Sequence, residues 1–154
     1  MWQDVVNLLR RVGLLRPMEE MAVRLTGYSI MGRMITWNAG VPYVDSLMLR
    51  SVGAKSGDLR DAVLFYVPDG QSWVIIGSVG GGPKHPAWVH NLRANPHAWV
   101  FVDRSRHPVE AEFLEGDERE RLWSAAAEVW PPYLQYAERA QPRVIEIIRL
   151  NRST

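Results

Sequence analysis

The sequence has 154 residues, a formal net charge of +1 and 47% hydrophobic residues, which indicates one soluble globular domain with a substantial core. This charge gives no global signal for nucleic acid as a partner. The chain has no cysteine, which excludes disulfides, thiolate nucleophiles and cysteine metal sites. Its four histidines show no ligand spacing with carboxylates, so no metal site is expected.

The first 40 residues differ in character from the rest. We expect them to form an N-terminal amphipathic helical segment ahead of a barrel domain over residues 41–154. Apolar residues recur at helical spacing over residues 1–16, while the arginines fall elsewhere on the helical wheel. A second amphipathic pattern covers residues 18–25, and residues 35–42 are predicted to be a linker into the first strand.

Residues 1–16 allow two readings that the sequence leaves open. As a basic amphipathic helix they would lie on a membrane surface or cover the mouth of a pocket. As an ordinary terminal helix they would pack on the barrel or stay loosely ordered. No apolar run approaches the about 18 residues that span a bilayer, and the start lacks a signal-peptide pattern. We therefore expect a cytoplasmic protein, which on the first reading is peripheral at the inner face of the cell membrane.

Residues 46–91 carry the clearest organisation. Three apolar runs of strand length, 47–52, 59–67 and 73–78, are separated by two glycine-containing turns, so they predict a β-meander. A glycine-rich loop then leads into a short helix over residues 87–94.

The second half of the chain adds further strands over residues 97–103, 109–113 and 143–150. Two helical stretches precede the last of them: Gly116-Asp117 supplies a stop and an N-cap for the first, and Pro131-Pro132 separates it from the second. This hairpin-rich order predicts a mainly β fold with α, of the α+β class: a small antiparallel β-barrel with peripheral helices.

Two loops of this barrel have a composition suited to chemistry. The first combines glycines with Lys55 and Ser56, with Arg60 just beyond, and a glycine-rich turn beside cations suits a phosphate. The second, Gly80–Gly82, leads into a helix whose N-terminus would face an anion or an electron-rich ring. Ordinary tight turns with solvated charges would look the same. Familiar catalytic motifs are missing, so an enzyme of this sequence would rely on a bound cofactor.

A longer constellation includes both loops. It runs from Leu49-x-x-x-Gly53-x-Lys55-Ser56-Gly57-x-x-Arg60 through Ser78-x-Gly80-Gly81 to His85-Pro86-x-Trp88-x-x-Asn91-Leu92-x-Ala94-Asn95-Pro96. This pattern resembles the deazaflavin-dependent nitroreductase family, and the likeness extends over roughly residues 45 to 150. Members of that family are split β-barrel proteins that bind the deazaflavin coenzyme of actinobacteria.

The resemblance implies an oxidoreductase in which reduced coenzyme F-420 passes a hydride to an electron-poor small-molecule acceptor: a quinone, a nitroaromatic or an activated enone. It implies that the coenzyme's phosphate and acidic tail lie on the first loop and its ring against the second and third strands. The implied coenzyme-binding residues are Ala54, Lys55, Ser56, Arg60, Asp61, Ala62, Val63, Leu64, Phe65, Ile76, Gly77, Ser78, Val79, Ala87, Trp88, Val89, His90 and Asn91. The implied acceptor contacts are Phe65, Trp130, Tyr133 and Tyr136, and catalytic roles fall to Ser78 and Tyr133.

The sequence departs from the family's pattern at three places. Ala54 and Val79 stand where cations are found in relatives, so positive charge toward the phosphate and tail is lost, and Lys84 could compensate. Trp130 and Phe65 stand where phenols can occur, which removes hydroxyl donors from the acceptor pocket. Reduction of any particular nitro drug is therefore in doubt.

Among acceptors we favour a quinone or another conjugated molecule, because the amphipathic start would suit a substrate dissolved in membrane. Two alternatives stay open: the same split barrel carrying flavin mononucleotide, and a non-enzymatic protein that binds or stores the coenzyme. Split barrels often dimerise, and a homodimer is also left open.

Overall fold

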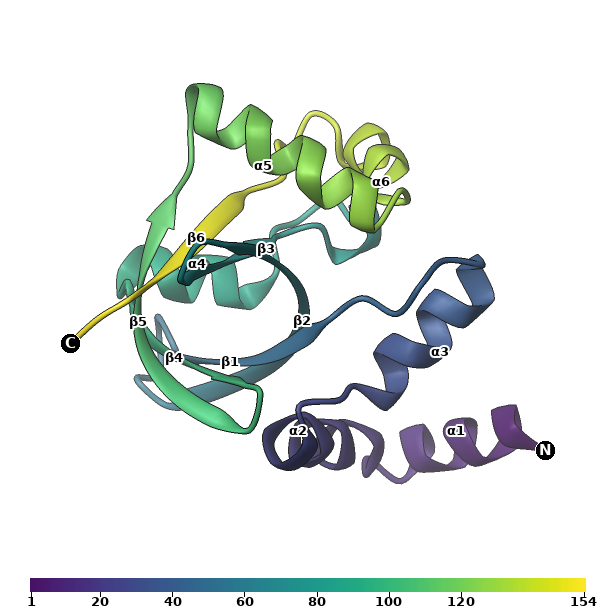
Figure 1. Ribbon diagram of the computed structural model, residues 1–154. Coiled ribbons are helices and arrows are strands. Elements are labelled where there is room, and N and C mark those ends of the chain that lie inside the picture. Colours follow the sequence, from purple (N-terminus) through teal and green to yellow (C-terminus); the bar gives the residue numbers. More distant parts are fainter.

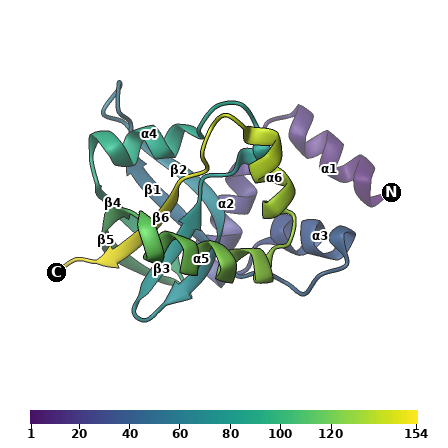
Figure 2. The ribbon, with the colours of Figure 1, turned by 90° about the horizontal axis from the view of Figure 1, so that it is seen from above.

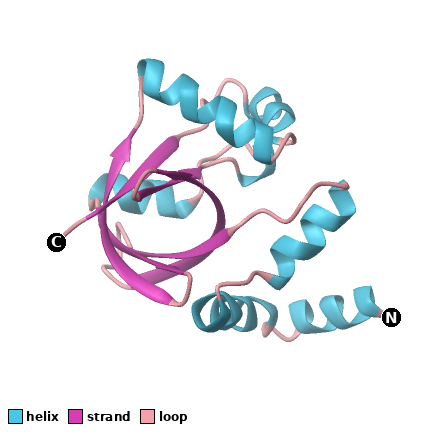
Figure 3. Cartoon of the chain, viewed as in Figure 1, coloured by secondary structure: helices cyan, strands magenta, loops and turns pink.

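The computed structural model describes residues 1–154, with the exception of the Trp2 side chain. Figure 1 and Figure 3 show a β-barrel with helices packed around it. The strands are β1 (Ser46–Val52), β2 (Leu59–Asp69), β3 (Ser72–Ile76), β4 (His97–Val102), β5 (Ser105–Phe113) and β6 (Ile147–Arg152). The helices are α1 (Trp2–Arg11), α2 (Leu15–Thr26), α3 (Ile30–Ala39), α4 (Ala87–Ala94), α5 (Gly116–Val129) and α6 (Tyr133–Ala140), with a 3-10 turn η1 (Val79–Gly81).

The described strands close into an antiparallel barrel in the order β1-β2-β3-β6-β5-β4. Strand β1 pairs with β2 on one edge and with β4 on the other, so that Arg50 lies opposite both Asp61 and Trp99. Hairpins make the pairings β1-β2, β2-β3 and β4-β5, and β6 enters between β3 and β5. The predicted α+β antiparallel barrel is confirmed.

The barrel interior is filled by alternate residues of the strands, as the period of two requires. Fully buried aliphatic side chains from β1, β3, β4 and β6 form this core, and each contributes about 1.5–3 kcal/mol by its burial. Helix α4 lies across one end of the barrel, as Figure 2 shows from above, and inserts Trp88, Val89 and Leu92 into the same core.

Two groups of helices cover the outside. Helix α2 packs through Val23 on Met48 and Phe101, on the outer face of β1 and β4. Helices α5 and α6 pack on the other side of the barrel, where Leu122 and Ala126 meet the outer residues of β3 and β6. None of the described helices is both long and apolar enough to cross a bilayer.

Three local expectations were wrong. The predicted linker over residues 35–42 is mostly helix α3, which begins after Ser29, whose hydroxyl accepts from the Gly32 amide at 2.7 Å, and ends at left-handed Gly40. The apolar residues of α3 do not form a buried stripe, since Trp37, for example, is 71% exposed. The sequence therefore lacks the helical period of apolar residues by which a helix is predicted.

The other two corrections concern where elements begin. The last strand starts at Ile147 rather than at residue 143, because the chain before it leaves the sheet and Arg143 bonds to a neighbouring loop. Helix α5 starts at Gly116 itself after Glu115, and Asp117 lies in its first turn instead of capping it with its side chain.

Candidate functional site

Two adjoining cavities lie on the outer face of β2, between the barrel and the helices around it. The basic cavity, of about 890 Å³, is lined by Arg10, Gly13, Leu15, Arg16, Glu19, Glu20, Met31, Gly53, Ala54, Lys55, Ser56, Arg60, Asp61, Ala62, Val63, Ala87, Trp88, His90 and Asn91. The aromatic cavity, of about 530 Å³, is lined by Glu19, Ser29, Met31, Gly32, Ile35, Ser46, Val63, Leu64, Phe65, Ile76, Ser78, Val79, Gly80, Pro86, Trp88, Trp130, Tyr133 and Tyr136. Glu19, Met31, Val63 and Trp88 line both, so the two cavities form one groove.

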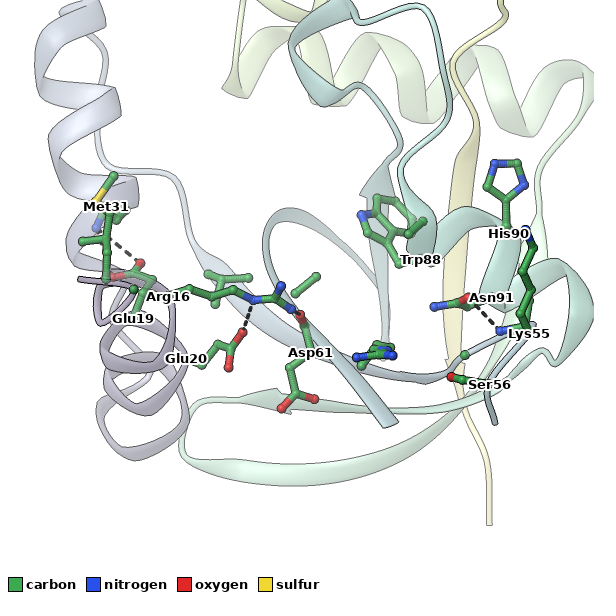
Figure 4. Close-up of a pocket in the computed structure, with 18 of the residues that line it drawn as sticks. Arg16, Glu19, Glu20, Met31, Lys55, Ser56, Asp61, Trp88, His90 and Asn91 are labelled. Atoms are coloured by element: carbon green, nitrogen blue, oxygen red, sulfur yellow. Dashed lines mark hydrogen bonds and ion pairs between the residues drawn. The ribbon is translucent and has the colours of Figure 1, made fainter. Parts of the chain in front are cut away.

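The first loop, between β1 and β2, is held by the buried side chain of Asn91. The Asn91 amide accepts a hydrogen bond from the Ala54 N–H at 3.0 Å, which Figure 4 draws as a dashed line. It also donates to the Ser51 hydroxyl at 3.3 Å, and the two bonds tie α4 to the loop. Within the loop the Asp58 amide donates to the Ser56 hydroxyl. Among the described residues no hydrogen bond uses the Lys55 or Ser56 amide, and these two N–H groups remain available to an anion.

The carboxylates of the basic cavity all have partners. Asp61 forms a two-bond ion pair with Arg50 across β1 and β2, with both distances 2.8 Å. Glu20 pairs with Arg16 at 2.7 Å, and Arg16 also donates to the Asp61 carbonyl. Glu19 accepts from the Ser29 hydroxyl and from the Met31 amide, and this fixes α2 to the start of α3.

The cations of the basic cavity are less engaged. Among the described residues, the side chains of Lys55 and Arg10 form no ion pair or hydrogen bond, and the Arg60 side chain meets only Asp58 at 3.7 Å in an exposed pair. An exposed pair at that distance contributes little, about 0–1 kcal/mol. Unpaired positive charge beside satisfied carboxylates makes this end of the groove a site for an anion.

Several side chains that line the aromatic cavity are buried, among them Ser78, Trp130 and Tyr133. Phe65 and Trp130 meet edge to face with ring centroids 5.3 Å apart, and Tyr133 meets Tyr136 edge to face at 6.1 Å. Burial, followed by the neighbouring Tyr136, raises the pKa of Tyr133 far above its usual value, so the phenol keeps its proton at neutral pH. Among the described residues no hydrogen bond uses its hydroxyl, which can therefore donate to a ligand.

The loop after β3 forms the floor of this cavity and is strained. Ser78 is buried, and Val79 has φ of 47°, a left-handed conformation that costs a β-branched residue about 1–3 kcal/mol. Gly81 packs tightly beneath α6: a Cβ there would lie 2.7 Å from the Tyr136 carbonyl oxygen. The loop and the tyrosines of α6 are thus placed together.

The structure gathers most of the predicted site residues in the groove. The predicted residues that line the basic cavity are Ala54, Lys55, Ser56, Arg60, Asp61, Ala62, Val63, Ala87, Trp88, His90 and Asn91. Those that line the aromatic cavity are Val63, Leu64, Phe65, Ile76, Ser78, Val79, Trp88, Trp130, Tyr133 and Tyr136. Two lie elsewhere. Val89 is fully buried in the barrel core, and Gly77 packs against it, since a Cβ at Gly77 would lie 3.0 Å from the Val89 side chain.

Sequence reasoning missed the wall that α1, α2 and α3 contribute. Arg10, Arg16, Glu19 and Met31 line the basic cavity, and Figure 4 shows the last three facing Lys55, Ser56 and Asn91 across it. The sequence signal that could have predicted this wall was the basic amphipathic pattern of residues 1–16, interpreted as a helix that covers the mouth of a pocket. Lys84, the residue expected to compensate for the lost cations, lines neither cavity.

The groove fits a ligand with an anionic end and a flat conjugated end. Free cations and amides lie at one end, and apolar and aromatic side chains lie at the other. A model of one protein family, described as F420H(2)-dependent quinone reductase, matches residues 22–150. The chain belongs to that family. The predicted resemblance to deazaflavin-dependent reductases is confirmed, and the family's description gives an oxidoreductase that uses reduced coenzyme F-420.

Individual relatives agree with the family. An F420H(2)-dependent quinone reductase of Mycobacterium tuberculosis is 38% identical over 85 residues, which cover 54% of this chain and 57% of that relative's length. A solved F420-H2 dependent reductase (FDR-A) superposes with a TM-score of 0.64 at 36% identity and covers 69% of this chain and 93% of its own. A structure described as a domain-swapped dimer has the same TM-score at 33% identity, with 79% and 93% covered.

Proposed function

We propose that this protein is a reductase that transfers a hydride from reduced coenzyme F-420 to a quinone-type acceptor. The observation that carries the proposal is the groove itself, in which unpaired cations adjoin an aromatic cavity. Membership of the family and the M. tuberculosis relative named as a quinone reductase support the coenzyme and the acceptor class.

In this proposal the basic cavity binds the anionic end of the coenzyme, and the aromatic cavity orients the ring and the acceptor. Lys55, Arg60 and the free amides of the first loop hold the coenzyme's phosphate and acidic tail, since these groups are acceptors of charge-assisted hydrogen bonds. Arg10 supplies from α1 positive charge that the sequence lacks at Ala54 and Val79, whereas Arg16 is already paired with Glu20. Residues of β2, together with Ser78 after β3, would hold the deazaflavin ring.

When bound, the reduced coenzyme supplies a hydride, that is two electrons and one proton, and releases a second proton, so a quinone becomes a hydroquinone. The protein needs no nucleophile for this step; it must hold ring and acceptor about 3–3.5 Å apart. Tyr133 keeps its proton and donates a hydrogen bond to the acceptor oxygen on which negative charge develops. Ser78 is the second donor at the cavity floor, and the aromatic side chains keep water out.

Fluorescence titration with coenzyme F-420 and steady-state reduction of menadione test the proposal together. We expect binding in the micromolar range or tighter and turnover of the quinone. Lys55→Ala should weaken binding about tenfold, as expected for one lost charge-assisted hydrogen bond. The matched control is Lys84→Ala, which removes an exposed lysine outside both cavities.

The alternatives predict different results in the same assays. Selective binding of flavin mononucleotide would keep the fold and overturn the coenzyme assignment. Tight binding of coenzyme F-420 without reduction of any acceptor would make the protein a coenzyme-binding protein.

We further propose that α1 associates with an anionic membrane surface. Val5 and Leu8 of α1 and Val12 directly after it are 41%, 59% and 55% exposed, and Arg10 and Arg11 lie in the last turn of α1. An exposed apolar face beside basic residues suits the interface of an anionic bilayer.

Co-sedimentation with vesicles of anionic phospholipid tests the membrane part. Leu8→Gln should lower the bound fraction several-fold, because burial of one leucine is worth about 1.5–3 kcal/mol. Leu134→Gln is the matched control, since Leu134 is 53% exposed on α6 and lines neither cavity. Equal partitioning of both variants and the parent protein would remove the membrane part of the proposal.

The oligomeric state is proposed to be a homodimer. The support is the domain-swapped dimer that superposes on 79% of this chain. Light scattering of the purified protein should give twice the mass of 17.6 kDa, and a mass of one chain would contradict it.

A further inference from the structure

Arg143, in the segment between α6 and β6, donates an unusual set of hydrogen bonds to the loop after β3. Its Nη1 donates to the Gly77 carbonyl at 2.9 Å and its Nη2 to the Ser78 carbonyl at 2.9 Å. Nε and Nη2 both donate to the Gly82 carbonyl, at 3.0 and 2.7 Å. His85 Nδ1 lies 3.4 Å from Nη1. One guanidinium therefore holds three carbonyls at both ends of the same loop.

No carboxylate explains the position of this arginine. Among the described residues Arg143 forms no ion pair, and the nearby Glu146 is paired with Arg93 instead. The Arg143 side chain is partly buried, and its N–H groups donate to backbone carbonyls. A planar fork with five N–H groups can bridge several carbonyls in this way, and the ammonium of a lysine cannot.

The bonds of Arg143 set the direction in which the loop's amides point. A trans peptide unit carries its C=O and N–H on opposite sides. Because the Ser78 carbonyl faces Arg143, the N–H of the same peptide unit, that of Val79, points away from Arg143. Ser78, Val79 and Gly80 line the aromatic cavity, so the loop has a guanidinium side and a cavity side.

The same loop carries the left-handed Val79 and the contact with α6. A β-branched residue with φ of 47° keeps that conformation only where its surroundings enforce it. Arg143 donates to the carbonyls of Ser78 and Gly82, one before and one after Val79, and these bonds hold Val79 in that conformation. The backbone of Gly81 lies in close contact with that of Tyr136, so a shift of the loop would displace Tyr136 on α6.

We propose that Arg143 is a positioning residue for the hydride-transfer site: it clamps the loop from Gly77 to Gly82 so that Ser78 and the Val79 amide face the ring and acceptor. The proposal rests on the proposed reductase function. Arg143 itself lines neither cavity, and it acts through the loop. Its replacement should therefore impair hydride transfer much more than binding of the coenzyme, whose charged tail is held at the basic cavity.

The test uses Arg143→Ala, with Arg152→Ala as a matched control. Arg152 also donates to a backbone carbonyl, that of Gln71 at 3.1 Å, but at a turn remote from the groove. We expect Arg143→Ala to lower kcat for menadione about a hundredfold, the usual cost of a misplaced reacting group, with little change in Kd for coenzyme F-420. Hydrogen–deuterium exchange of residues 77–82 should rise, and added guanidinium ion should restore both exchange protection and kcat. Ammonium ion should restore neither.

The outcomes separate the clamp from a general loss of structure. If Arg143→Ala unfolds, Arg143→Lys decides, because it keeps the charge and length but not the fork: raised exchange of the loop and a lowered kcat support the proposal. Unchanged exchange and kcat in either folded variant would overturn it, as would a loss of kcat that guanidinium does not recover in a folded Arg143→Ala protein. A parent protein that neither binds the coenzyme nor reduces menadione would overturn the reductase function, while exchange of the loop still tests the clamp.

Discussion

The two halves of the groove hold their functional groups in opposite ways. In the basic cavity Lys55, Arg10 and Arg60 are exposed and nearly free of partners, whereas in the aromatic cavity Ser78 and Tyr133 are at most 9% exposed. Solvated charges attract an anion with little demand on its orientation. Buried donors on a clamped loop and a packed helix fix an orientation closely. In the proposed function, affinity and geometry are therefore assigned to different parts of one ligand site.

The largest effect should come from a substitution beside the aromatic cavity, in the loop after β3. Gly81→Ala should lower the free energy of unfolding by about 2–4 kcal/mol, because Gly81 has φ of 81° and a Cβ would meet the Tyr136 backbone at 2.7 Å. Chemical denaturation measures this loss. Gly80→Ala is the control: Gly80 also has positive φ but has open space around it, so about 1 kcal/mol is expected. Equal losses in the two variants would mean that the contact with α6 does not matter.

A smaller effect is expected from a substitution that releases the first loop, beside the basic cavity. Asn91→Ala removes the acceptor of the Ala54 amide and the link to Ser51, so the first loop should lose its fixed position. We expect Kd for the coenzyme to rise about five- to tenfold, consistent with one lost buried hydrogen bond, while kcat at saturation holds. Titration by fluorescence measures it. Asn95→Ala removes a similar bond to the His97 amide at the other end of α4 and should leave Kd unaltered.

The smallest effect concerns pH and the surroundings of the clamp. Burial, and then the nearby Arg143, lower the pKa of His85 below its usual value. Glu146 opposes this shift, and His90 and Arg93 add to it. The unfolded chain then binds more protons than the folded one, so this contribution to stability is present above the ordinary pKa and is lost as pH falls through the folded value. Thermal unfolding between pH 7 and 5 should show a decline that is shallower in His85→Gln. An identical decline would remove His85 from this account.

The sequence predicts the barrel well because strand alternation and turn glycines are local signals. The strands from β1 to β4 and helix α4 lie close to their predicted ranges, since each has its pattern within a few residues. Strand β5 begins at Ser105 rather than at residue 109, because its pairing with β4 starts at Ser105 opposite Val102. Helix α3 could not be found in this way, because its exposed apolar residues, such as Trp37, obscure the helical period.

The parts of the site that escaped prediction depend on packing between distant segments. Arg10 and Arg16 reach the basic cavity only because α2 docks on the barrel through Val23. Arg143 looked like the first residue of a strand, and its role depends on a loop about sixty residues earlier. Contacts of such long range leave no periodic trace in the sequence.

The most direct test of the division between the two cavities is a pair of variants measured by stopped-flow, with reduced coenzyme F-420 and menadione. Lys55→Ala should raise Kd for the coenzyme and leave the rate of hydride transfer at saturation unchanged. Tyr133→Phe, which keeps the ring and removes only the donor, should leave Kd unchanged and slow hydride transfer about 10- to 100-fold. If both variants change Kd and the transfer rate together, or if the two effects are exchanged, binding and orientation are not divided between the cavities as we propose.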